Sequence, residues 1–212
     1  MLFLSVSFSI LLIAVRIFYT DSMAYFMFTW NLFLAVIPVL FSRMLVYFNK
    51  INLKSLLALA IWMLFLPNAP YLITDIFHFT EMKGMPAWFD LLLVTSAAWN
   101  GLMLAIVSLL QVEDFFQKFM SKFKVNMIMF ASIFTCSYGI YLGRYLRFNS
   151  WDVVTAPISL VKSIGYQVLF PHQNIKTWAF TVLFGAMIWL VYYTIKNLPS
   201  LVKPLAPGYR NS

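Results

Sequence analysis

The chain has 212 residues, of which 62% are hydrophobic and 10% are charged, and its mean hydropathy is +0.83. A soluble domain carries about 25% charged residues, so this chain has too few charges to cover a globule in water, and lipid must be its solvent. The net charge of +8 would raise nucleic acid as a partner of a soluble protein, but no basic run with interleaved aromatics supports that, and cytoplasmic loops rich in Lys and Arg explain the surplus.

Six apolar segments are each long enough to cross about 30 Å of hydrocarbon, which takes about 20 helical residues. Only helices or closed barrels satisfy the backbone in lipid, and continuous apolar runs favour helices. We therefore predict an all-α integral membrane protein with one transmembrane domain over residues 1–212 and six transmembrane helices. The predicted spans are Leu2–Tyr19, Tyr25–Val46, Leu53–Thr74, Phe89–Leu110, Val125–Leu146 and Trp178–Lys196.

The first of these segments resembles a signal peptide in its position. It lacks the positively charged start of a signal peptide, and its apolar run is long for one. We expect a retained first span.

The third span ends in “PNAPYLITDIFHF”, residues 67–79. Pro67 and Pro70 prevent an unbroken helix, so we expect a break at residues 66–69 and a helix that restarts at Pro70, with Asn68 or Ala69 near its N-cap. Broken spans are where membrane proteins build binding sites. The polar residues of this segment recur at helical spacing and would form one stripe: Asn68, Tyr71, Asp75 and His78.

The fourth and fifth spans carry signs of close packing. Ala97, Gly101 and Ala105 recur every four residues, which indicates a helix-packing face. Asn100 is either a polar tether between helices or part of the floor of a site. The one cysteine, Cys136, excludes an intramolecular disulfide and is interpreted as a packing residue.

The stretch from Trp151 to Lys176 is substantially apolar but interrupted by Pro157, Gly165 and Pro171. We predict an interfacial or re-entrant helix between spans five and six. A seventh, broken span would reverse the C-terminus and place its lysines on the wrong side of the membrane.

Orientation follows from the connections between spans. If the spans alternate, most basic residues fall on one side, which the positive-inside rule makes cytoplasmic, with both termini inside. Arg144, Arg147, Lys162 and Lys176 on the other side weaken this bias. The basic residues on the cytoplasmic side are Arg43, Lys50, Lys54, Lys118, Lys122, Lys124, Lys196, Lys203 and Arg210.

Charged or amide residues inside a span are costly, so each is a functional hypothesis by default. With alternating spans, such residues from four different spans share the outer end of the membrane. Residues with this common depth are Trp30, Asn31, Asn68, Tyr71, Asp75, His78, Asp90, Arg144, Arg147, Asn149 and Asp152.

Two arginines dominate this group. Arg144 and Arg147 are three residues apart, which places them on one helix face, and guanidinium groups suit carboxylate or phosphate. Alternatively they pair with Asp75, Asp90 or Asp152, or extend to the membrane surface. Both interpretations stay open.

Asp75 precedes His78 by three residues, and such an acid can orient an imidazole for acid–base work. Alternatively, Asp75 accepts hydrogen bonds from an arginine while His78 lies at the headgroup level. Metal sites need three or four ligands, and the only other histidine is His172. We predict no metal and no cofactor.

The segments “WNLFLAVIP”, “PNAPYLITD”, “WFDLLL” and “YLGRYLRFNSWD” resemble a bacterial family of multi-pass membrane proteins catalogued as a domain of unknown function. The resemblance runs from about Trp30 to the end of span six. It implies an all-helical membrane fold and a shared polar motif set, and it supplies no activity. The matching positions are Trp30, Asn31, Pro67, Asn68, Pro70, Tyr71, Thr74, Asp75, Asp90, Gly143, Arg144, Arg147, Asn149, Ser150, Trp151 and Asp152.

The leading hypothesis is a protein of the bacterial inner membrane with an outward-facing polar site for a lipid headgroup or a lipid-linked anionic substrate. Asp75, His78 and Asp90 would perform acid–base work if chemistry occurs. The second hypothesis is a non-enzymatic small subunit or assembly factor of a larger membrane complex, and the third is a transporter. The partners are then membrane lipids, a membrane protein or a second copy of the chain. The expected binding residues are Arg144, Arg147, Asn68, Tyr71, Asn31, Asn149 and Asp152.

Overall fold

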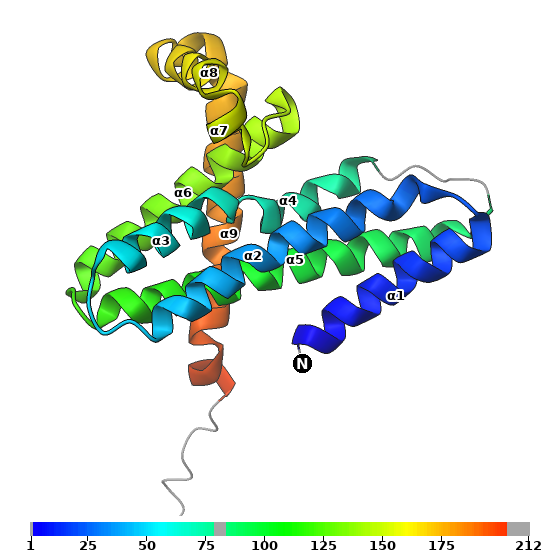
Figure 1. The fold of residues 1–212 in the computed structure, drawn as a ribbon, viewed down its shortest axis with the longest axis horizontal. Coiled ribbons are helices and arrows are strands. Elements are labelled where there is room, and N and C mark those ends of the chain that lie inside the picture. Colours follow the sequence, from blue (N-terminus) through cyan, green and yellow to red (C-terminus); the bar gives the residue numbers. More distant parts are fainter. Residues whose placement is uncertain (1, 79–83, 203–212) are drawn as a thin grey trace, which may run out of the picture.

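The computed structural model describes residues 2–78 and 84–202, and these residues form helices and short connections without a strand (Figure 1). The elements are α1 (Leu2–Thr20), η1 (Met23–Tyr25), α2 (Phe26–Val46), α3 (Leu53–Phe65), α4 (Asn68–Thr74), η2 (Asp75–His78), α5 (Ala87–Gln117), α6 (Lys122–Leu146), α7 (Asp152–Thr155), α8 (Pro157–Leu169), η3 (Pro171–Asn174) and α9 (Ile175–Val202).

Within residues 2–78 and 84–202, six helical segments are long and apolar enough to cross a membrane, which confirms the predicted all-α membrane fold. The helix that holds the fourth predicted span, α5, continues past Leu110 to Gln117. Its last turns hold Glu113, which is buried against α9, so a polar side chain there does not end the helix. The six segments are Leu2–Thr20, Phe26–Val46, Leu53–Phe77, Ala87–Gln117, Lys122–Leu146 and Pro171–Pro199.

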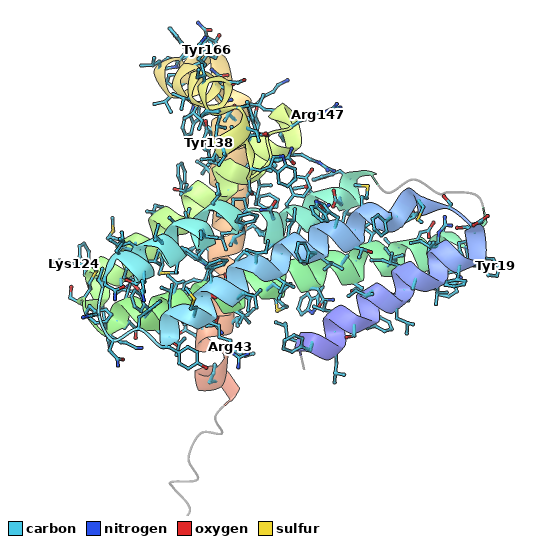
Figure 2. The ribbon with its side chains drawn as sticks, viewed as in Figure 1. Tyr19, Arg43, Lys124, Tyr138, Arg147 and Tyr166 are labelled. Carbon is cyan, nitrogen blue, oxygen red and sulfur yellow. The ribbon has the colours of Figure 1, made fainter. Side chains whose placement is uncertain are left out.

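The long helix α5 is the centre of the molecule and packs against α1, α2 and α4 (Figure 1). The helix α9 packs mainly against α6 and runs across the direction of the other long helices. Tyr19 and Lys124 lie at opposite ends of the bundle in Figure 2. Cys136 is 2% exposed in the core, in agreement with a packing role.

The third span is broken where the sequence predicts it, between Phe65 and Asn68. The helix restarts at Asn68, two residues before the expected Pro70. Pro70 is tolerated there because the N–H groups of a first helical turn have no partner within the helix.

Two glycines bring neighbouring helices close to this break. A Cβ on Gly101 of α5 would lie 2.2 Å from the carbonyl oxygen of Ala69, and one on Gly139 of α6 would lie 2.6 Å from Cγ of Pro67. Helices in lipid gain their attraction from such close approach. Gly101 therefore belongs to a packing face, as its spacing in the sequence indicates.

The segment between spans five and six forms α7 and α8. With 13 residues, α8 is too short to cross about 30 Å of hydrocarbon. The side chain of Gln167 holds its far end by accepting a hydrogen bond of 2.9 Å from Tyr138 Oη. Apolar residues such as Val161 and Leu169 remain 67% and 74% exposed along its outer side.

Candidate functional site

The Arg144–Asp75 pair joins the end of α6 to the end of α4. Arg144 Nη1 donates to Asp75 Oδ1 at 2.9 Å, and the two side chains are 11% and 1% exposed. Arg144 Nη2 donates to the carbonyl oxygen of Thr74 at 2.5 Å. Since the last carbonyl groups of a helix lack partners within it, the guanidinium satisfies both a charge and a helix end.

Two further side chains complete this cluster. Tyr71 Oη accepts a hydrogen bond of 3.2 Å from Arg144 Nη1, and its ring centroid lies 5.4 Å from Arg144 Cζ. Asn31 Nδ2 of α2 donates to Asp75 Oδ2 at 3.3 Å. The structure thus brings together Asn31, Tyr71, Asp75 and Arg144, which come from three predicted spans. For Arg144, the alternative of an ion pair with Asp75 is the one found.

Ser150 closes the break in the third span. Its hydroxyl donates to the carbonyl oxygen of Leu64 at 3.1 Å and accepts from Asn68 Nδ2 at 2.8 Å. Asn68 Nδ2 also donates to the carbonyl oxygen of Phe65 at 3.0 Å. Carbonyl groups left open by the break are costly in an apolar surrounding unless they are paired. Ser150, in the segment after α6, supplies the partner of the Leu64 carbonyl, and Asn68 supplies that of Phe65.

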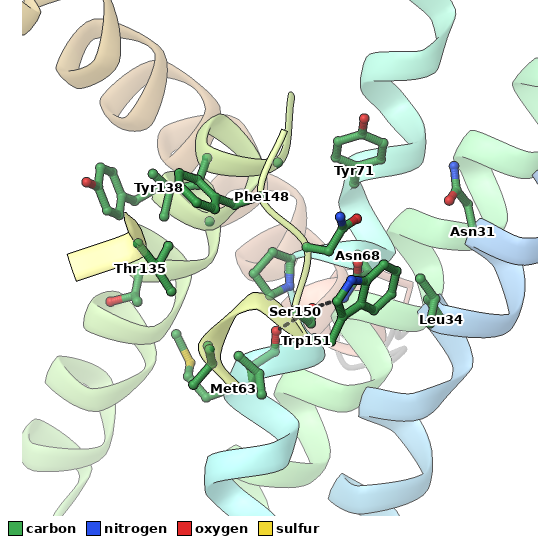
Figure 3. A pocket seen from close by; sticks show the side chains of 18 of the residues that line it. Asn31, Leu34, Met63, Asn68, Tyr71, Thr135, Tyr138, Phe148, Ser150 and Trp151 are labelled. Atoms are coloured by element: carbon green, nitrogen blue, oxygen red, sulfur yellow. Dashed lines mark hydrogen bonds between the residues drawn. The ribbon is translucent and has the colours of Figure 1, made fainter. Parts of the chain in front are cut away.

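A pocket of about 620 Å³ lies over this break (Figure 3). Figure 3 shows Asn31 and Leu34 of α2 on one side, Thr135 and Tyr138 of α6 on the other, and Trp151 between them. Among the described residues that line it there is no Lys, Arg, Asp or Glu. The pocket is therefore apolar with several amide and hydroxyl groups, and the Arg144–Asp75 pair lies behind Tyr71 and Asn31.

The mouth of the pocket is apolar. Met27, Trp30, Trp151 and Val153 line the pocket and yet remain between 42% and 50% exposed. Met27 and Trp30 belong to the first two turns of the span α2. The mouth therefore lies at the N-terminal end of α2.

Asp90 does not belong to this site. It forms a bidentate ion pair with Arg16 of α1, with Nε to Oδ1 at 2.6 Å and Nη2 to Oδ2 at 3.2 Å. The two side chains are 2% and 0% exposed. Sequence reasoning missed Arg16, although a lone arginine inside an apolar run was itself a signal of a buried partner.

Arg147 and Arg144 do not share a helix face, so that prediction was wrong. The helix α6 ends at Leu146, and Arg147 follows it in the left-handed conformation with φ 59°. The side chain of Arg147 is exposed and points away from the bundle in Figure 2. Arg147 does not line the pocket.

Asn149 lines the pocket, whereas Asp152 lies just beyond it. The backbone N–H of Asn149 donates to Asp152 Oδ2 at 2.7 Å, and the Thr155 hydroxyl donates to Oδ1 at 2.9 Å. These hydrogen bonds, that of Asn149 first, lower the pKa of the Asp152 carboxyl below its usual value. Asp152 fixes the turn that presents Ser150 and Trp151.

The side chain of His78 lies outside the described residues, so its predicted role stays a prediction. Its backbone ends η2. Within residues 2–78 and 84–202, no group of three His, Cys, Asp or Glu side chains is close enough to hold a metal ion.

Asn100 tethers α1 to α5 and does not line the pocket. Its Nδ2 donates to the carbonyl oxygen of Ser5 at 3.0 Å and to Ser9 Oγ at 2.8 Å. The tether was one of the two alternatives that the sequence left open.

A third charged group was not predicted. Glu113 accepts a hydrogen bond of 2.6 Å from Tyr192 Oη and forms an ion pair with Lys196, which joins α5 to α9.

The six spans and the enclosed polar residues define a multi-pass integral membrane protein with a pocket inside its helix bundle. The model of the family described as “Protein of unknown function (DUF1361)” matches residues 30–191. The chain belongs to this family, and the match includes every residue of the pocket lining except Met27 while it leaves out α1. No match was found among curated proteins or among solved structures.

Proposed function

We propose that the protein binds a membrane lipid, or a lipid-linked molecule, in the pocket at the broken third span. The observation that carries this proposal is the mouth, where exposed apolar side chains of α2 and α7 face the surroundings of the spans. Such a rim suits an acyl or prenyl chain that stays in the bilayer, and it would repel a solute that arrives from water.

The size and lining of the pocket support the same proposal. Its volume of about 620 Å³ falls within the range of about 300–1,000 Å³ that is usual for ligand sites. Its wall combines leucine, methionine and tryptophan with the amides of Asn31, Asn68 and Asn149. An amphiphile can place its chain at the mouth and its polar end beside these amides.

The Arg144–Asp75 pair then has a positioning role. The guanidinium of Arg144 already donates to Asp75, to Tyr71 and to the carbonyl oxygen of Thr74. It holds the ring of Tyr71 against the pocket, while Asp75 fixes the amide of Asn31. Direct binding of an anion by Arg144 would have to compete with these partners.

We propose that the pocket opens at the outer leaflet of the membrane. The basic residues between α2 and α3 and between α5 and α6 lie at the ends of those helices remote from the mouth. The positive-inside rule makes that remote end cytoplasmic.

Native mass spectrometry of the full chain in mild detergent tests lipid binding. We expect the wild type to retain one lipid per chain and Thr135→Phe, which fills the pocket, to lose it. Met127→Phe is the matched control, because Met127 is 54% exposed on the same helix and does not line the pocket. Equal lipid retention by the wild type and Thr135→Phe would contradict the proposal.

A further inference from the structure

The hydrogen-bond balance of the pocket restricts the headgroup that it can take. Asn31 donates its side-chain N–H to Asp75, and Asn68 donates to the Phe65 carbonyl and to Ser150. A carboxylate and a carbonyl accept hydrogen bonds and never donate them, so they fix which end of each amide is nitrogen.

Two amide oxygens of the lining are therefore left to accept hydrogen bonds from a ligand. The described residues give no hydrogen bond to Oδ1 of Asn31 or to Oδ1 of Asn68, and both residues line the pocket. Each oxygen is desolvated at a cost when a ligand fills the pocket, unless the ligand supplies an N–H or O–H. An anionic phosphate or carboxylate offers acceptors and would leave both oxygens unpaired.

Charge leads to the same restriction. The lining holds no charged side chain among the described residues, and Arg144 beside it is neutralised by Asp75. A charged headgroup in this surrounding would have no counter-ion and would lose its hydration.

We infer that the ligand is a lipid with an uncharged headgroup that donates hydrogen bonds through hydroxyl groups, of the kind that diacylglycerols and glycolipids carry. This inference rests on the proposed lipid-binding function. Asn31 and Asn68 are the residues that select the headgroup, by accepting hydrogen bonds from its hydroxyls.

Photoactivatable diacylglycerol and phosphatidic acid with the same acyl chains test it, with the full chain in phosphatidylcholine nanodiscs. We expect diacylglycerol to label pocket peptides about tenfold more than phosphatidic acid, since the loss of donors to desolvated acceptors costs at least that much. Asn31→Leu should reduce this preference severalfold, whereas Asn126→Leu, at an exposed position of α6 outside the pocket, should keep it.

The outcomes separate the inference from the function on which it rests. Equal labelling, or stronger labelling by phosphatidic acid, overturns the headgroup inference and leaves lipid binding standing. If neither probe labels the pocket, both proposals fall. The comparison of the two lipids on the wild-type chain needs no variant, so it decides the matter even if Asn31→Leu does not fold.

Discussion

Two arginine–aspartate pairs are buried in the described part of the chain, and their surroundings differ. The Arg16–Asp90 pair is bidentate and closed off, with side chains 2% and 0% exposed. The Arg144–Asp75 pair shares its charges with Asn31 and Tyr71, whose side chains line a pocket. A buried ion pair by itself therefore indicates only that its loss would destabilise the fold. A neighbouring cavity is the additional observation that indicates a binding site.

The largest effect on stability is expected at the Arg16–Asp90 pair. Asp90→Leu leaves the guanidinium of Arg16 buried without its counter-ion, which should lower the free energy of unfolding by about 3–5 kcal/mol. Thermal unfolding in detergent measures this. The double variant Arg16→Met with Asp90→Leu removes both charges and should recover most of the loss. If Asp90→Leu were as stable as the wild type, the Arg16–Asp90 pair would not stabilise the packing of α1 against α5.

A smaller loss is expected at the pocket pair. Arg144→Leu should destabilise the protein by about 1.5–3 kcal/mol, the usual range for hydrogen bonds to charged groups, because Asn31 still donates to Asp75. Arg144→Lys keeps the charge but not the forked geometry, and it should release lipid in native mass spectrometry. Unchanged lipid retention in both variants would contradict the positioning role.

Two glycines that face the third span differ in how closely that span packs against them. A Cβ on Gly101 would clash with the Ala69 carbonyl at 2.2 Å, whereas one on Gly143 meets nothing closer than 3.5 Å. Gly101→Ala should therefore cost about 1–3 kcal/mol of unfolding free energy, and Gly143→Ala should be neutral or slightly stabilising. Urea or detergent denaturation distinguishes them, and equal effects would contradict the described packing at the break.

Ser150→Ala removes two hydrogen bonds at the break and should cost about 1 kcal/mol or somewhat more. Ser159→Ala, at an exposed position of α8, is the control. Hydrogen exchange of residues 64–72 reports the local opening. Identical protection in the two variants would mean that Ser150 does not stabilise the broken span.

The smallest effect is expected at Asp152, which is half-buried in the turn after α6. Because the hydrogen bond from Asn149 lowers its pKa in the folded state, its stabilising contribution is present above the unfolded pKa and is lost as the pH falls through the folded value. An NMR titration of the Asn149 amide should show a midpoint below the usual aspartate pKa of about 3.9. A midpoint at or above that value would contradict the hydrogen bond from the Asn149 N–H to the Asp152 carboxylate.

The spans and the break could be predicted from sequence because each has a local cause. Apolar length determines the spans, and Pro67 with Pro70 determines the break. The partners of the charges depend on which helices meet, so Asp90 was grouped with Arg144 although it binds Arg16. Arg147 was wrongly predicted to share a helix face with Arg144, because no proline or glycine marks the end of α6 at Leu146.

The pocket itself has no linear signal. Its wall comes from α2, α3, α4, α6 and the segment after α6, and several of its residues are ordinary leucine or methionine. Ser150 belonged to the expected motif, yet its role became visible only when the carbonyl of Leu64 was found beside it.

An experimental density map of the full chain in lipid nanodiscs tests the central claim most directly. The account predicts elongated density that begins beside Asn31 and Asn68 and leaves the pocket between Trp30 and Trp151 toward the bilayer. A pocket filled by the protein's own side chains, with lipid density elsewhere on the surface, would contradict it.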